Sequence, residues 1–334
     1  MTVLQAWSDG WRRVLRAPWL IIGLWVVTLL LALPLAMTLR GMLIEHLGSS
    51  LAGGPAVSGV NFDWWNEFLA QAAGIGQTFV PAILGFAAVI KNLSSLADAT
   101  TLPTVIASAV TANILLSTFL LGGVLDRLAR DRATGASAFF AASGVFFFRF
   151  LRLGLIAAVV YWLLFIRLHP LLFDRLFTRL THDVTVERTA FGYRLLLYLL
   201  FALLVAAVNL IFDYAKIRLV VEDRRSALGA LAAALRFIRR NPGSAIGLYL
   251  LNTALFAAVM AFYALVAPGA AGGSVAIAAF FAGQLYIVLR VMGRLLFAAS
   301  QIALFQGRLA HAGYAARPVP AWPDSPAAEA VRPQ

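Results

Sequence analysis

The chain has 334 residues, of which 61% are hydrophobic and 13% are charged, and its mean hydropathy is +0.85. So little polar surface cannot coat a soluble globule of this length, so the composition excludes an ordinary soluble domain and predicts an all-α, polytopic membrane bundle. The chain has no cysteine, which excludes a disulfide framework, a thiolate nucleophile and a cysteine metal site.

The chain opens with a segment, residues 3–17, that has the spacing of an amphipathic helix lying flat at a membrane interface. Its predicted apolar face consists of Leu4, Trp7, Trp11 and Val14. Arg12 and Arg16 lie beside that face, where they can reach anionic lipid headgroups or a protein partner. Pro18 follows and predicts the corner at which the chain turns into the bilayer, because proline disfavours helical geometry in the residue before it.

Six apolar stretches are near the length of about 20 residues that a membrane-crossing helix needs. The predicted spans cover residues 19–38, 103–125, 153–168, 195–212, 244–266 and 275–296. The stretch Phe79–Ile90 is also apolar, but it is short and contains Pro81 and Gly85. It is predicted to be re-entrant or interfacial, with a seventh span as the competing interpretation.

Residues 226–240 form a second amphipathic segment, 224 positions after the first, with Ser226 as its predicted N-cap. Identical pairs at this offset include Leu4 and Leu228, Arg12 and Arg236, Arg16 and Arg240, and Pro18 and Pro242. This match favours an internal duplication. A weaker third copy is predicted at residues 134–148, where Asp131, Arg132 and Thr134 parallel Asp223, Arg224 and Ser226.

Two longer connections and a tail separate or follow the spans. Residues 40–102 are rich in Gly, Ser and Ala, and residues 174–194 are predicted to be a mixed-charge loop. Residues 313–334 contain five prolines and are predicted to be a disordered tail after a single transmembrane domain over residues 1–312.

The formal net charge is +12, and most basic residues fall on the side of the predicted spans that holds both termini. Lys and Arg are retained on the cytoplasmic side of short loops, so both termini are predicted to be cytoplasmic. The charge is therefore explained by topology and does not indicate nucleic acid, while contact with anionic headgroups is expected. Arginine is far commoner than lysine, which is typical of a GC-rich bacterial genome and places the chain in a bacterial inner membrane.

The stretch Leu219-Val-Val-Glu-Asp-Arg-Arg-Ser-Ala-Leu228, followed by residues 236–242 and a span, resembles a segment of several poorly characterised bacterial six-helix families. These include families similar to the membrane domain found beside glycerophosphodiester phosphodiesterases. The resemblance covers about thirty residues well. It implies a six-helix membrane fold and no established activity.

Few residues indicate catalysis. His169, Asp174, His182, Asp183 and Glu187 are metal-ligand types, but their spacing matches no metal motif, and a solvated loop is the favoured interpretation. The sequence contains no nucleophile elbow, zinc-binding His-Glu-x-x-His pair or phosphate-binding glycine loop. We therefore expect no catalytic residue, no metal and no cofactor.

Arg290 and Arg294 lie four residues apart on the sixth span and mark a candidate intramembrane polar site, with Asp213 as a possible ion-pair partner. Snorkelling to the inner boundary or a structural ion pair is favoured over a substrate site. One amide lies in each of four spans, at Asn113, Asn209, Asn252 and Gln284. Interhelical hydrogen bonds are favoured for them over a polar conduit.

The basic residues of the second amphipathic segment, Arg225, Arg236 and Arg240, are predicted to face nearly one side. The first functional hypothesis is a non-catalytic membrane protein that organises lipids or a cytoplasmic protein partner through its amphipathic segments. The second is a permease or export subunit coupled to a separate energising protein.

Overall fold

The computed structural model describes residues 1–48, 50–51, 61–79, 94–95, 97–99, 104–267 and 274–311. Every regular element in these ranges is helical. The elements are α1 (Val3–Leu15), α2 (Pro18–Leu47), α4 (Phe62–Gln71), η1 (Gly74–Thr78), α6 (Thr104–Arg130), α7 (Ala136–Trp162), η2 (Leu163–Leu168), η3 (Leu171–Leu176), α8 (Phe177–Thr181), α9 (Glu187–Val221), α10 (Ala227–Arg240), α11 (Pro242–Val266) and α12 (Ser274–His311). The predicted tail, residues 313–334, and residues 80–90 of the apolar stretch lie outside the described residues.

Six of these segments are long and apolar enough to cross a membrane, as predicted. They are Pro18–Leu47, Ala107–Arg130, Ala136–Thr181, Glu187–Val221, Pro242–Val266 and Val275–Leu309. Pro18 and Pro242 both occupy the first turn of their helices, where the missing amide hydrogen leaves no internal bond unmade. The two corners predicted from these prolines are therefore real helix starts.

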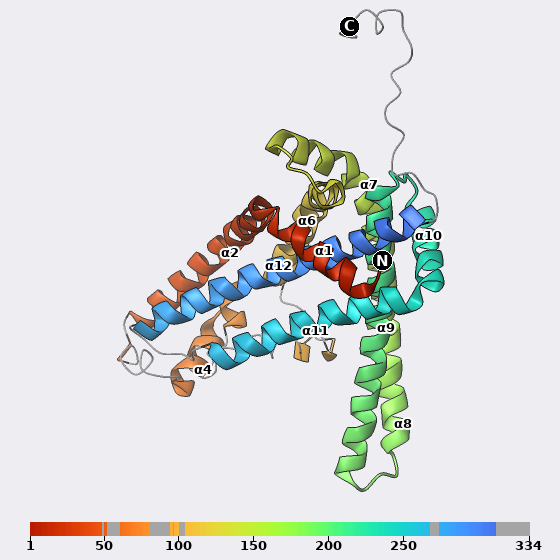
Figure 1. Cartoon of the computed structure of the whole chain (residues 1–334). Coiled ribbons are helices and arrows are strands. Elements are labelled where there is room, and N and C mark those ends of the chain that lie inside the picture. The colour runs from red at the N-terminus through yellow and green to blue at the C-terminus, as the bar shows by residue number, and fades with distance from the viewer. Residues whose placement is uncertain are drawn as a thin grey trace, which may run out of the picture.

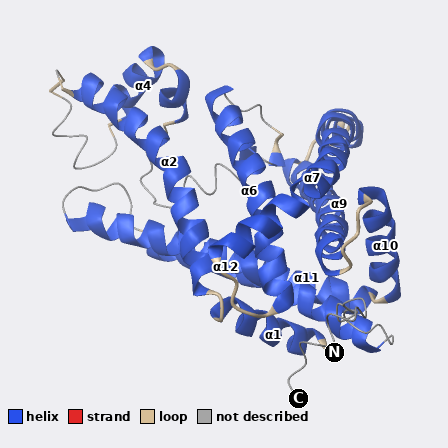
Figure 2. Cartoon of the chain, turned by 90° about the horizontal axis from the view of Figure 1, so that it is seen from above, coloured by secondary structure: helices blue, strands red, loops and turns tan. Residues whose placement is uncertain are grey.

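The long helices leave one common junction in two directions (Figure 1). The first arm consists of α2, α11 and α12, and the second is the hairpin of α7, α8 and α9, with α6 between the arms. Seen from above, α7 and α9 are viewed nearly end-on while α2 and α12 extend to the opposite side (Figure 2). Helices α1 and α10 and the last turns of α6, α9 and α12 meet at this junction. We call it the arginine-rich end.

The main hydrophobic core lies at the arginine-rich end. Its centre is the second half of α12, where Leu296, Ile302 and Phe305 are fully buried. By contrast, α2 buries none of its residues. The six spans are thus held together at one end, and their remaining length presents apolar side chains outward, as lipid-facing helices require.

The third span differs from its prediction. The sequence divides residues 134–148 from 153–168, but in the structure α7 runs through this division from Ala136 to Trp162 and η2 follows it directly. Arg149 and Arg152, which lie at and just after the predicted division, are good helix formers, and no proline separates the two parts. The proposed third amphipathic helix is therefore the first half of a membrane-length helix.

The predicted loop over residues 174–194 is wrong for most of its length. Helical turns continue through η2, η3 and α8 to Thr181, and α9 begins at Glu187. Pro170 has no amide hydrogen, and wider π-helical turns on both sides accommodate the missing bond. Leu172, Leu197 and Phe201 form a small second core that closes this hairpin.

Candidate functional site

Helix α1 crosses the second half of α12 at close range. Its contact face contains Ala6, Gly10 and Val14, all buried. A Cβ added at Gly10 would lie 2.8 Å from the Ser300 Cβ and 2.9 Å from the Ser300 backbone, so only glycine permits this approach. Of the predicted apolar face, Val14 is fully buried, and Trp7 and Trp11 are partly buried against the core, whereas Leu4 is 68% exposed. Small residues and most of the predicted apolar face thus hold α1 against the rest of the fold.

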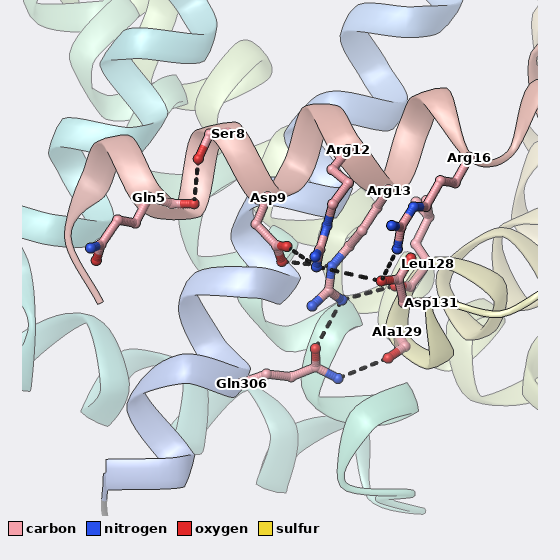
Figure 3. A network of polar contacts seen from close by, with 10 residues as sticks. All are labelled: Gln5, Ser8, Asp9, Arg12, Arg13, Arg16, Leu128, Ala129, Asp131 and Gln306. Carbon is pink, nitrogen blue, oxygen red and sulfur yellow. Dashed lines mark hydrogen bonds and ion pairs between the residues drawn. The ribbon is translucent and has the colours of Figure 1, made fainter.

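Arg13 lies at the centre of a polar network between α1, α6 and α12 (Figure 3). Its guanidinium donates to Asp9 (2.8 Å), to the Leu128 carbonyl (2.9 Å) and to the Gln306 side chain (2.9 Å). Gln306 in turn donates to the Ala129 carbonyl at 3.0 Å. The carbonyls belong to the last turn of α6, where helix geometry leaves acceptors unpaired. Arg13 therefore joins three helix ends in one place.

Arg12 and Arg16, predicted to contact lipid or a partner, are both placed beside Asp131 (Figure 3). Their guanidinium nitrogens lie 3.5 and 3.6 Å from the Asp131 carboxylate, and Arg12 also pairs with Asp9. Asp131 follows α6 directly and has a left-handed φ of 48°, which aspartate tolerates better than most residues. The arginines of the first amphipathic helix therefore share two carboxylate partners within the protein, Asp9 and Asp131.

Helix α10 packs on the last turns of α9 through an alanine-rich face. The buried residues are Ala227, Ala230, Ala233, Ala234 and Phe237. Ser226 is the N-cap, as predicted, and accepts a hydrogen bond from the Gly229 amide at 3.1 Å. Asp223 precedes α10 with a left-handed φ of 49°, close to the value at Asp131, and its carboxylate pairs with Arg149 of α7.

The arginines of α10 face a cavity of about 520 Å³, which we call the arginine pocket. Arg236 and Arg240 line it together with Arg218 of α9 and Arg308 of α12. One carboxylate, Glu222, lies 3.6 Å from Arg218 and also pairs with Arg224. The Nε atoms of Arg218 and Arg308 are buried without a hydrogen-bond acceptor. The pocket therefore carries unbalanced positive charge and free donors, the features of an anion site.

Arg225, predicted to share a face with Arg236 and Arg240, precedes the N-cap of α10 and is not part of the pocket wall. The pocket also contains two residues that sequence reasoning did not single out, Arg218 and Arg308. They lie 90 residues apart in the sequence, on helices separated by two others, so no local pattern connects them. The role of Arg13 was not predicted either, although Arg13 lies three residues after Gly10 and seven after Ala6 and therefore shares a helix face with them.

The structure does not pair Asp213 with Arg290 or Arg294 of the candidate intramembrane site. Asp213 pairs with Lys216 at 2.9 Å, and the ion pairs within the described ranges include neither Arg290 nor Arg294. Arg290 stacks over the Tyr286 ring at 5.9 Å, and Arg294 is exposed at the surface of α12. This arrangement suits snorkelling arginines and not a closed ion-pair site.

Three of the four amides in the spans make interhelical hydrogen bonds. The Trp25 indole donates to Gln284 at 3.0 Å, the Tyr161 hydroxyl donates to Asn209, and Asn252 donates to Ser300 at 2.9 Å. The fourth, Asn113, is exposed on α6. The amides thus join helices α2 to α12, α7 to α9 and α11 to α12.

The histidines and carboxylates of the hairpin are not gathered into a metal site. Within the described part of the chain, no group of three or more such side chains is placed to hold an ion. His169 is buried and contacts the Ala97 carbonyl at 2.8 Å, whereas the exposed His182 pairs with its neighbour Asp183. Nearby, a hydrogen bond from the Tyr198 hydroxyl lowers the pKa of the Asp98 carboxyl below its ordinary value.

The fold and the membrane-length helices define the class: a multi-pass helical membrane protein. Comparison with protein families, curated proteins and solved structures finds no match to this chain.

Proposed function

We propose that this chain is a non-catalytic protein of the bacterial inner membrane, with both termini cytoplasmic, that gathers anionic lipids at its arginine-rich end. The observation that carries the proposal is the arginine pocket. Among the ion pairs of the described residues, only Arg218 of its four arginines has a carboxylate partner, Glu222, and two of the four retain buried donors without acceptors. A phosphate oxygen would satisfy those donors and offset the charge.

Lipid is the favoured anion because the pocket lies where three membrane-length helices end or begin. Arg218 is in the last turns of α9, Arg308 is near the end of α12, and Asn241 caps the start of α11. Basic residues at such a boundary attract anionic headgroups by about 1 kcal/mol each. A lipid phosphate reaches this depth without leaving the bilayer surface.

The bonding of the amides supports a scaffold over the permease alternative. Gln284, Asn209 and Asn252 each form a hydrogen bond with a neighbouring helix. Side chains paired in this way stabilise helix contacts and do not line a water-filled route.

We also propose that α1–α2 and α10–α11 descend from one duplicated unit, with the start of α7 as a third copy. Two observations support this proposal. Both amphipathic helices lead into a helix with proline in its first turn. Asp131 and Asp223, which parallel each other in the sequence, share a left-handed φ within one degree.

The test is the double variant Arg236→Gln/Arg240→Gln, with Arg225→Gln/Arg239→Gln as a control of equal charge on the same segment. Full-length protein is reconstituted in mixed phosphatidylglycerol and phosphatidylcholine, and the phosphatidylglycerol retained per protein is measured after detergent exchange. The affinity of the arginine pocket for phosphatidylglycerol is expected to fall about five-fold or more in the pocket variant, the factor for at least one basic residue near a headgroup, so this variant should retain less phosphatidylglycerol than wild type. The control is expected to match wild type.

Equal retention by both double variants would overturn the lipid proposal. The same proteins in nanodiscs can be used to recover partners from a membrane extract. A protein lost only from the pocket variant, with lipid retention unchanged, would assign the pocket to a protein partner instead.

A further inference from the structure

A second cavity, separate from the arginine pocket, opens between the first turns of α2 and the facing surfaces of α6 and α7. Its volume is about 530 Å³. Most of its wall is apolar and includes Leu20, Leu24 and Val27 of α2, Leu120 of α6, and Phe139 and Phe140 of α7. We call it the α2 groove.

The α2 groove has the depth of one lipid leaflet. Its wall on α2 extends from Trp19 to Val27. At a helical rise of about 1.5 Å per residue this distance is roughly 12 Å. Half of a hydrocarbon core of about 30 Å is close to that value. An acyl chain lying in the groove would therefore remain in its own leaflet.

The end of the groove at the start of α2 is positively charged. Arg16 and Arg127 line it there. Arg127 is only 7% exposed, and its Nη2 donates to the Arg16 carbonyl at 3.0 Å. Its Nη1 is buried without an acceptor. A buried charged donor in this state costs free energy until an acceptor reaches it.

The carboxylates nearby do not balance this charge. Asp9 and Asp131 face the guanidiniums of Arg12, Arg13 and Arg16, and Arg127 adds a fourth. An anion is therefore required at one end of the cavity and an apolar chain along the rest. A phospholipid with an anionic headgroup combines both in one molecule.

We propose that the α2 groove binds one anionic phospholipid, with an acyl chain along Gly23, Leu24 and Val27 and its phosphate at Arg16 and Arg127. This inference rests on the membrane-spanning character of α2, α6 and α7 and not on the arginine pocket. It also explains why α2, which buries none of its residues, still follows a defined course beside α6.

Gly23 provides a direct test, because it lines the groove and a Cβ added there meets no atom within 4 Å. Gly23→Phe is expected to fill the groove without touching either arginine. Gly41→Phe is the matched control, since Gly41 is on the same helix, also has open space, and is not part of the groove wall. Gly23→Leu serves as a smaller obstruction, and thermal denaturation midpoints in detergent show which variants are folded.

The measurement is native mass spectrometry of the full-length protein titrated with phosphatidylglycerol, with phosphatidylcholine as the uncharged-headgroup comparison. In the Arg236→Gln/Arg240→Gln background, which removes the lipid of the arginine pocket, the protein and its Gly41→Phe form are expected to retain one phosphatidylglycerol preferentially, and Gly23→Phe to lose that adduct. Arg127→Gln is expected to weaken it about five-fold, the factor for one basic residue near a headgroup, whereas Arg132→Gln, an exposed neighbour, leaves it unchanged.

Glycerol phosphate added in excess separates a lipid from a free phosphate. If it displaces the adduct, or if its own binding survives Gly23→Phe, the site takes a soluble phosphate and the lipid assignment is overturned. Equal phosphatidylglycerol binding by Gly23→Phe and Gly41→Phe would also overturn it. Arg236→Gln/Arg240→Gln is expected to keep this adduct, so failure of the arginine pocket and failure of the α2 groove are distinguishable.

Discussion

The two amphipathic helices carry arginines at corresponding positions and put them to different uses. Around α1, Arg12 and Arg16 meet the carboxylate of Asp131 from the neighbouring α6–α7 connection. Around α10, Arg236 and Arg240 face a cavity whose other charged walls are also arginines. The same sequence feature thus produces ion pairs with a neighbouring carboxylate at one junction and a cavity walled by arginines at the other.

The difference arises from what each helix packs against. Helix α1 lies over the end of α12 and reaches the end of α6, which supplies two carbonyl acceptors and Asp131. Helix α10 lies over the end of α9, next to Arg218, and its far end meets Arg308. Neighbouring helix ends, and not the amphipathic helix itself, decide whether its arginines are free.

The largest effect is expected from removing the buried arginine of the first junction. Arg13→Ala deletes three hydrogen bonds and leaves Asp9 and Gln306 with fewer partners. Breaking a buried charged contact typically costs about 3 kcal/mol or more in the free energy of unfolding. The thermal midpoint in detergent should fall clearly. Arg12→Ala is the control, because Arg12 is half exposed and its loss should cost less than about 1 kcal/mol. Equal midpoints for the two variants would contradict the assigned role of Arg13.

A second prediction separates the packing of the two junctions. Gly10→Ala forces a Cβ against the backbone of Ser300, and such overpacking should cost about 2 kcal/mol of folding stability. Gly144→Ala on α7 meets open space and should stabilise the protein by up to about 1 kcal/mol, since alanine favours helix. Opposite shifts of the thermal midpoint are therefore expected. At the corresponding position of α10 the chain already has a buried alanine, Ala234.

The smallest effect is expected from a substitution that removes a carboxylate partner from the arginines of the first junction, so that this junction resembles the second. Asp131→Asn preserves a residue that tolerates the left-handed backbone but releases Arg16, while Arg12 keeps its ion pair with Asp9. The phosphatidylglycerol retained per protein should rise about five-fold, the gain expected for one freed basic residue. Asp223→Asn is the control, because Arg149 keeps a contact with the Arg224 carbonyl. The same rise in both variants would show that net charge alone governs lipid retention.

Much of the architecture could be predicted from local features of the sequence. Apolar stretches of membrane length gave the six spans, and Pro18 and Pro242 gave two helix starts. Charge was the less reliable guide. It placed a break near Arg149 and a loop after Asp174 where the backbone is helical, because charged residues form helices as readily as apolar ones.

The sequence by itself determined that the chain is helical, membrane-embedded and amphipathic at two places, because length, hydropathy and proline chemistry act within a few residues. The tertiary structure alone decided which arginines are neutralised and which are free. Arg13 meets the Leu128 carbonyl across 115 positions, and Arg127 meets the Arg16 carbonyl across 111. Contacts of that range depend on how helix ends come together, which no local pattern encodes.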